Sequence, residues 1–195
     1  MSENRTEPNH IEFRNAFIVG TNIYLRPLDE NDANGDYPSW LNDNDVCMGN
    51  SHHTFPNTKK ATIEYISFVS SSRDAIVLAI VEKVTGRHVG NISLQDINLI
   101  YRSAEFAIII GEKSSWGKGY GEEAGLLLMK HGFENLNLHR IYCGTFENNK
   151  GMQKLAEKLH MKSVGRQRQA AYKNGKYLDI LQYDLLRTEF DVKKA

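Results

Sequence analysis

Apolar and polar positions along the chain follow two periods, which predict strands alternating with helices. Alternating or short β-branched runs predict seven strands, at residues 23–26, 75–84, 88–94, 101–110, 139–146, 162–168 and 177–186. Apolar positions three and four apart predict helices after Thr58 and over residues 149–159. A capping Asp29 predicts a third, irregular helix toward Leu41. Turns are expected at Thr85-Gly86, at residues 96–98 and at residues 173–176.

One strand leads directly into a glycine-rich loop and then into a helix. Residues 106–110 are apolar and β-branched, residues 111–115 form a polar turn, and Gly117, Gly119 and Gly121 follow at alternate positions. The residues after the loop then take a helical period, with these positions on or beside one face: Ala124, Leu126, Leu127, Leu128, Met129, His131 and Phe133. Such a unit directs several backbone N–H groups and a helix N-terminus at one spot, which favours a phosphate or pyrophosphate ligand.

The glycine spacing excludes two common phosphate-binding motifs. Five residues separate Gly111 from Gly117-Lys118, whereas a Walker loop needs four. A dinucleotide fingerprint that starts at Gly117 would need a third glycine where Glu122 stands. The remaining pattern, Trp-Gly-Lys-Gly-Tyr-Gly at residues 116–121, resembles the acyl-CoA pyrophosphate loop of the GCN5-related N-acetyltransferases (GNAT). The version with an aromatic residue in place of Gln or Arg resembles the branch that contains ribosomal-protein Nα-acetyltransferases and spermidine N-acetyltransferases.

The resemblance covers about residues 18–187 and implies a fold, a cosubstrate and a set of binding residues. The implied fold is mixed α/β (α+β), of the GNAT acyl-CoA N-acyltransferase type, with a mostly antiparallel mixed sheet flanked by helices. Residues 16–190 would form the single domain, after a tail or edge segment at residues 1–15. The implied cosubstrate is acetyl-CoA, with no metal. It would contact Phe106, Ile108, Ile109, Ile110, Trp116, Gly117, Lys118, Gly119, Tyr120, Gly121 and Asn149.

Glu105, at the start of the strand before the loop, is the candidate catalytic residue. The run at residues 102–110 resembles the corresponding strand of spermidine N-acetyltransferases, and a carboxylate near the acceptor amine can take its proton. The alternative is a structural carboxylate paired with Arg102 or a lysine. The resemblance also implies that the pantetheine arm pairs with the backbone of residues 106–110, where one N–H group polarises the thioester carbonyl.

Asn149 opens a second segment that resembles the family's Asn-x-x-Ser/Ala…Tyr/Leu-Glu-Lys-Leu-Gly-Phe pattern. On that match Asn149 contacts the cofactor arm or an ordered water, although it also suits a plain helix cap. The segment departs from the pattern at Met152, at His160-Met161 and at Ala156. The departure at Ala156 removes the tyrosine that protonates the leaving thiolate in many members. The sequence therefore leaves the general acid open.

Residues 40–56 have no period and are rich in polar and aromatic side chains, which indicates a loop. This loop and the last hairpin are expected to form the acceptor site or, alternatively, to be a solvated loop and ordinary hairpin packing. The candidate acceptor residues are Trp40, Asp45, His52, His53, Phe55, Tyr172 and Tyr177.

Composition narrows the class of protein without naming a substrate. The 195 residues contain 24 Lys and Arg and 24 Asp and Glu, so no global basic field favours nucleic acid. No apolar run is long enough to span a bilayer, and the N-terminus lacks the apolar stretch of a signal peptide. Cys47 and Cys143 have no metal-binding spacing, which indicates reduced thiols in a cytoplasmic protein.

The sequence therefore predicts an acetyl-CoA-dependent N-acetyltransferase that acts by direct transfer on a primary amine of a small molecule, such as an amino sugar or a polyamine. The alternatives are a protein Nα-acetyltransferase of the ribosomal-protein type and a non-catalytic acyl-CoA-binding module. No nucleic-acid or membrane partner is expected. A homodimer is possible because folds of this type leave strand edges exposed.

Overall fold

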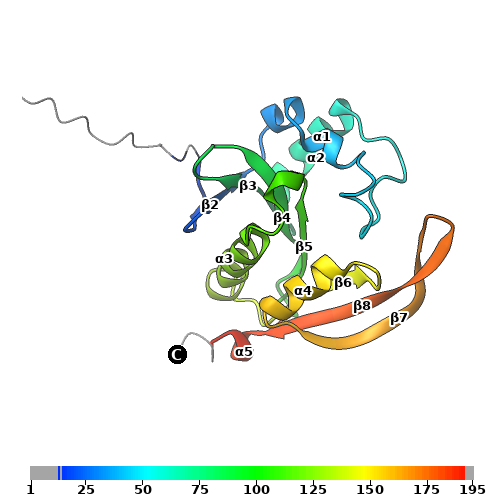
Figure 1. The fold of residues 1–195 in the computed structure, drawn as a ribbon. Coiled ribbons are helices and arrows are strands. Elements are labelled where there is room, and N and C mark those ends of the chain that lie inside the picture. Colours follow the sequence, from blue (N-terminus) through cyan, green and yellow to red (C-terminus); the bar gives the residue numbers. More distant parts are fainter. Residues whose placement is uncertain (1–12, 14, 192–195) are drawn as a thin grey trace, which may run out of the picture.

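The computed structural model describes residue 13 and residues 15–191. Eight strands form one sheet, in the order β1-β2-β3-β4-β5-β6-β8-β7 (Figure 1). The strands are β1 (Ile18–Val19), β2 (Ile23–Pro27), β3 (Ile76–Glu82), β4 (His88–Asn98), β5 (Ser103–Ile110), β6 (Arg140–Phe146), β7 (Lys162–Lys173) and β8 (Lys176–Leu186). The helices are η1 (Glu30–Asn34), α1 (Tyr37–Trp40), α2 (Lys59–Ser71), η2 (Lys113–Ser115), α3 (Tyr120–Glu134), α4 (Lys150–Lys158) and α5 (Arg187–Asp191).

The neighbouring strands β5 and β6 separate after a short contact. They form the one parallel pair of the sheet, and residues 103–105 pair with residues 140–142. Beyond that point β5 pairs only with β4, and this pairing continues to the end of β5, where Ile110 lies opposite Gly90. One backbone edge of residues 106–110 is therefore left without a strand partner, which opens the sheet in the middle.

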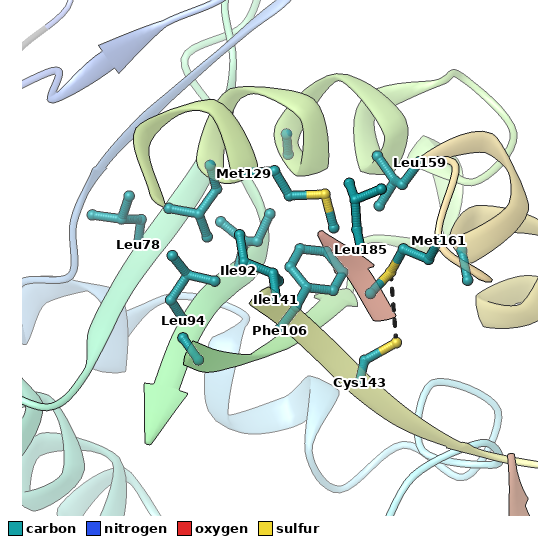
Figure 2. Packing of buried hydrophobic residues seen from close by; sticks show 14 of the residues in the cluster. Leu78, Ile92, Leu94, Phe106, Met129, Ile141, Cys143, Leu159, Met161 and Leu185 are labelled. Atoms are coloured by element: carbon teal, nitrogen blue, oxygen red, sulfur yellow. Dashed lines mark hydrogen bonds between the residues drawn. The ribbon is translucent and has the colours of Figure 1, made fainter. Parts of the chain in front are cut away.

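Apolar layers cover both faces of the sheet. The larger cluster packs α3 and α4 against one face, with Phe106, Met129 and Leu159 among its fully buried side chains (Figure 2). Cys143 lies in this layer, where burial raises the pKa of its thiol to about 12 and its Sγ is 3.8 Å from Met161 Sδ. The smaller cluster packs α1, α2 and η1 against the other face. Both cysteines are free and buried, in agreement with the interpretation as ordinary thiols.

The predicted mixed α/β class is confirmed, but several boundaries differ. The turn predicted at residues 96–98 is wrong, because β4 continues to Asn98 and the chain reverses at residues 99–102. The polar residues that suggested a turn coincide with an irregularity in the strand. The register shifts between Gln95 and Asn98, and Asp96 has a φ of 49°. The helix predicted from Asp29 splits into η1 and α1, since Gly35 is extended and Pro38 lies in the first turn of α1.

Three further elements differ from the prediction. β7 runs five residues beyond the predicted end at residue 168, and the hairpin that it forms with β8 projects away from the helices (Figure 1). β1 and α5 were not predicted, because two residues and five residues are too short to show a period. Apart from Phe13 and Asn15, the predicted tail at residues 1–15 lies outside the described residues.

We expect His160→Gly to raise the free energy of unfolding by about 0.5–1 kcal/mol. α4 ends in a Schellman arrangement, in which Met161 N donates to Ala156 O and His160 N donates to Glu157 O, both at 2.9 Å. His160 therefore has a φ of 63°, a conformation in which glycine avoids the Cβ clash. Urea unfolding of the wild type, His160→Gly and His160→Ala measures the effect. An equal gain from alanine would contradict a conformational cause.

Candidate active site

The loop after β5 presents a row of unpaired backbone N–H groups. Gly117 and Gly119 have φ values of 77° and 84°, which only glycine adopts without strain. These conformations change the direction of the chain at the start of α3, whose N-cap is Gly119. No residue in the described part of the chain accepts a hydrogen bond from the N–H groups of residues 117–122. Together with the helix N-terminus they form a cradle that an anionic group such as a pyrophosphate would fill.

Trp116 fixes this loop to the end of β5. Its indole Nε1 donates to Ile110 O at 2.8 Å, while its ring remains about half exposed beside the loop. The hydrogen bond joins the two segments that the sequence predicts to bind the cofactor. A tryptophan can therefore replace the usual Gln or Arg here as a structural anchor for the loop.

A cleft of about 750 Å³ extends from the loop along the unpaired edge of β5. It is lined by three segments: the end of β5 with the glycine loop, the start of α4, and the loop at residues 45–50. Of the predicted cofactor-binding residues, the structure brings these to the cleft: Ile108, Ile109, Ile110, Trp116, Gly117, Gly119, Tyr120, Gly121 and Asn149. Phe106 is buried in the core instead, so only its backbone could contribute.

Lys118 points away from the cleft, at the other side of the loop. Its Nζ is 3.3 Å from Glu82 Oε1, and the Tyr120 hydroxyl donates to the same oxygen. Hydrogen bonds from Thr85, Tyr120 and Lys118 lower the pKa of Glu82 to about 2. This cluster holds the loop against β3.

Lys150 is the lysine that lines the cleft. Its Nζ donates to two uncharged acceptors, Glu147 O at 3.1 Å and Gln153 Oε1 at 3.2 Å, and no carboxylate among the described residues pairs with it. Sequence reasoning missed Lys150 because a lysine at the start of a helix carries no signal of its own.

Asn149 has a structural role that the sequence left as an alternative. Its Oδ1 caps α4 by accepting from Met152 N at 3.0 Å, and its Nδ2 donates to Gly49 O at 3.0 Å. The side chain thereby ties the loop at residues 45–50 to α4 while it lines the cleft. Ala156, by contrast, is fully buried in the core and does not line the cleft.

A second cavity, of about 490 Å³, lies on the opposite face of β5. β4 and β5 form its floor, while α1, α2, residues 50–52 and Asn57 line its sides, and it is partly open to solvent. Asn50, Ile108 and Ile109 line both the cavity and the cleft. The two spaces therefore meet at the middle of β5, where that strand has lost its partner.

Glu105 lines this second cavity and is half-buried. Burial, and then the nearby charge of Asp96, raise the pKa of its carboxyl. The pairing with Arg102 that the sequence allowed is not formed, since Arg102 Nε donates to Asn137 O at 2.9 Å. No hydrogen bond or ion pair joins the Glu105 side chain to another residue of the described chain. This environment suits a general base.

The predicted acceptor residues do not all gather in this cavity. His52 lines it, and Lys173 Nζ donates to the carbonyl oxygen of His52. Trp40 is buried, and its ring lies against Gly111 and against His88 at 5.0 Å. It therefore packs in the core and lines neither space.

The remaining predicted acceptor residues are also elsewhere. His53 and Phe55 are exposed and line neither space. Tyr172 is exposed and packs edge-on against Tyr177, with ring centroids 5.0 Å apart. Asp45 lies at the cleft, where it pairs with Lys113 at 2.7 Å. Sequence reasoning missed the polar residues of β4 and the tyrosines of α1 and α2 that do line the cavity, since each resembles an ordinary strand or helix position.

The sequence matches the family description "Acetyltransferase (GNAT) domain" over residues 22–162. The chain belongs to this family of acetyltransferases, and it is therefore an acyltransferase. Members of the family use acetyl-CoA.

Individual relatives agree with this assignment. The chain is 27% identical to the spermidine N(1)-acetyltransferase of Escherichia coli K12 over 169 residues, which are 86% of this chain and 88% of the relative. It is 29% identical over 128 residues to the N-acetyltransferase p20 of Bacillus licheniformis, covering 66% of this chain and 71% of the relative. The fold resembles the crystal structure of the Vibrio cholerae spermidine N-acetyltransferase in complex with CoA and spermine. That match has a TM-score of 0.79 and 22% identity, and it covers 87% of this chain and 98% of the other.

The described residues contain neither a helix suited to a membrane nor a candidate metal cluster. No helix within residues 15–191 is long and apolar enough to cross a membrane. Over the same part of the chain, His, Cys, Asp and Glu side chains form no cluster of three that could hold a metal ion.

Proposed function

We propose that this protein transfers the acetyl group of acetyl-CoA to a primary amine of a small molecule. The observation that carries the proposal is the meeting of the two spaces at Ile108 and Ile109. A cradle for an anion lies at the end of one space, and an unpaired carboxylate, Glu105, lies in the other. Donor and acceptor can thus reach one point from opposite faces of β5, which is the arrangement that direct transfer requires.

The chain's own groups have distinct roles in this proposal. The N–H groups of residues 117–122 bind the pyrophosphate, and the free edge of residues 106–110 aligns the pantetheine arm. The bound thioester supplies the acetyl group. A backbone N–H group of this edge stabilises the oxyanion that forms as the amine nitrogen bonds to the thioester carbon. Glu105 takes the proton that the amine loses when the carbon–sulfur bond breaks. The departing thiolate receives its proton from solvent, since Ala156 supplies none.

A small acceptor suits the second cavity better than a protein N-terminus does. The cavity lies beside α2, residues 50–52 and Asn57, and its volume of about 490 Å³ suits a small molecule. The relatives named for spermidine acetylation also act on a small amine.

An acceptor screen tests the function directly. Purified protein with acetyl-CoA would be assayed for thiol release with amino sugars, polyamines, amino-acid amides and peptides that begin with Ser, Ala or Met. We expect turnover on small amines. Turnover on peptides alone would favour the Nα-acetyltransferase. Binding of acetyl-CoA without transfer to any amine would favour the non-catalytic module.

A further inference from the structure

Glu105 has a polar neighbour on β4. Gln95 lies directly opposite Glu105 in the antiparallel pairing of β4 and β5, so the two side chains point to the same face of the sheet, and both line the second cavity. The Cβ atoms of opposite residues in such a pair are about 4.5–5.5 Å apart, which is close enough for one small group to contact both side chains. Both residues are half-buried, so a ligand in the cavity can reach them.

One oxygen of Gln95 is free to accept a hydrogen bond. Gln95 Nε2 donates to Ser93 Oγ at 2.8 Å, which fixes the orientation of the amide. No residue in the described part of the chain donates to Gln95 Oε1. The buried side-chain atoms without a partner in that part are Asn91 Nδ2 and Thr145 Oγ1. Gln95 Oε1 is not among these buried atoms, and it is therefore accessible to a ligand.

The next pair of residues on this face leaves room for an amine. Ser93 lies opposite Ala107, about 7 Å along the strands from Gln95 and Glu105, and both of these small residues line the cavity. The pair beyond them contains Ile109, where the cavity meets the cleft. A small amine can therefore lie over Ala107, between the polar pair and the point that the thioester reaches from the cleft.

A primary amine offers two N–H groups during acetyl transfer. When its nitrogen bonds to the thioester carbon, the nitrogen becomes positively charged and carries two hydrogens. Glu105 takes one of them as a proton. The other stays on the nitrogen and becomes the N–H of the amide product as the carbon–sulfur bond breaks. The positive charge strengthens the hydrogen bond of this N–H group, so an acceptor beside Glu105 stabilises the transition state more than the free amine.

We propose that Gln95 is this second acceptor: its Oε1 accepts from the N–H group that the nitrogen keeps, while Glu105 takes the other proton. The inference rests on the proposed function and deepens it, because it names a residue that selects primary amines. A secondary amine has one N–H group at the same stage, and Glu105 removes that proton, so Gln95 has nothing to accept. Gln95 is thus a specificity-determining residue whose amide is oriented by Ser93.

The variant Gln95→Met tests the residue, since methionine has a similar length but no oxygen. The substrates are the best amine of the acceptor screen and its N-methyl derivative, compared by kcat/KM with saturating acetyl-CoA. We expect the primary amine to lose about tenfold, because a charge-assisted hydrogen bond is removed, while the N-methyl amine changes little. The preference for the primary amine should fall by the same factor. The steric effect of the methyl group is present in both proteins and cancels in this comparison.

The matched control is Gln182→Met, because Gln182 is a half-buried residue of β8 that lines neither space. It should keep the wild-type preference. An unchanged preference in Gln95→Met, or an equal loss for both amines, contradicts the assignment. If the wild type does not acetylate the N-methyl amine, the primary amine decides: an unchanged kcat/KM overturns the inference. A fall with unchanged acetyl-CoA affinity and an unchanged acidic limb of the pH profile supports it.

A second variant, Gln95→Asn, decides the question if Gln95→Met loses its thermal transition. Asparagine keeps a polar amide but withdraws its oxygen by one methylene group, so the preference for the primary amine should fall in the same direction. Wild-type preference in Gln95→Asn would then overturn the inference and leave acetyl transfer established. Binding of acetyl-CoA without turnover on any amine would instead refute the proposed function.

Discussion

Gly121→Glu is expected to lower the affinity for acetyl-CoA by about a hundredfold or more, because the new side chain would occupy the cleft and place a negative charge beside the phosphates. A Cβ on Gly121 would lie 3.8 Å from Ile108 and Leu155 and 4.0 Å from Ile110, which is ordinary contact distance. The backbone is not in the left-handed region there, so the variant should fold. Calorimetric titration with acetyl-CoA measures the loss.

The control for this variant is Gly165→Glu on β7. Gly165 is exposed, has no atom within 4 Å of an added Cβ and lies outside the cleft. Its substitution introduces the same charge and should leave the affinity unchanged. Gly119→Glu is a weaker test, since its φ of 84° would add backbone strain to any loss of binding. If Gly121→Glu binds acetyl-CoA with wild-type affinity, the prediction that the pyrophosphate binds at this loop is wrong.

Glu105→Gln is expected to lower kcat/KM by about two orders of magnitude at neutral pH, the usual contribution of a positioned base. The pKa of Glu105 is raised by burial and by Asp96, so the wild-type rate should fall with decreasing pH at a value above the ordinary glutamate range. The rate falls as the pH decreases because only the ionised carboxylate accepts a proton. The glutamine variant should have a low rate without this acidic limb. Activity is measured from about pH 5 to about pH 9, so that the profile includes the fall in rate on its acidic side.

The matched control is Glu64→Gln, which removes an exposed glutamate of α2 that pairs with Lys60. It should retain the wild-type rate and pH profile. If Glu105→Gln retains wild-type turnover, Glu105 is not the general base. Loss of acetyl-CoA binding in the same variant would indicate a structural role instead, because Glu105 does not line the cleft.

Local physics explains why the strand, the glycine loop and the helix after it could be predicted from the sequence. Gly117 and Gly119 adopt positive φ, and Gly121 leaves room in the cleft, so each glycine is required by its own backbone or by its immediate surroundings. The strand before the loop and the helix after it show their periods within a few residues. A motif of this kind can be recognised without knowing what packs around it.

The acceptor side was predicted less well, because its residues come together from distant segments. Trp40 was expected in the pocket and packs in the core, since the position of Gly111 beside its ring cannot be read from either local sequence. Asn91 was not singled out, because an asparagine in a strand looks like a solvent-facing residue until α2 is placed over it. Its surroundings depend on His88 and Asp32, which the fold brings together.

By itself, the sequence determined the fold class, the glycine loop and the identity of Glu105 as a carboxylate at the start of β5, because hydrophobic period and backbone conformation are local properties. Only the tertiary structure decided which side chains line the cleft and the cavity. The separation of β5 from β6 creates the cleft, and the cover of α2 creates the cavity. Burial, the loss of water from Glu105 and the unpaired donor of Asn91 are consequences of that packing. They arise from contacts between residues far apart in the chain, which no single stretch of sequence contains.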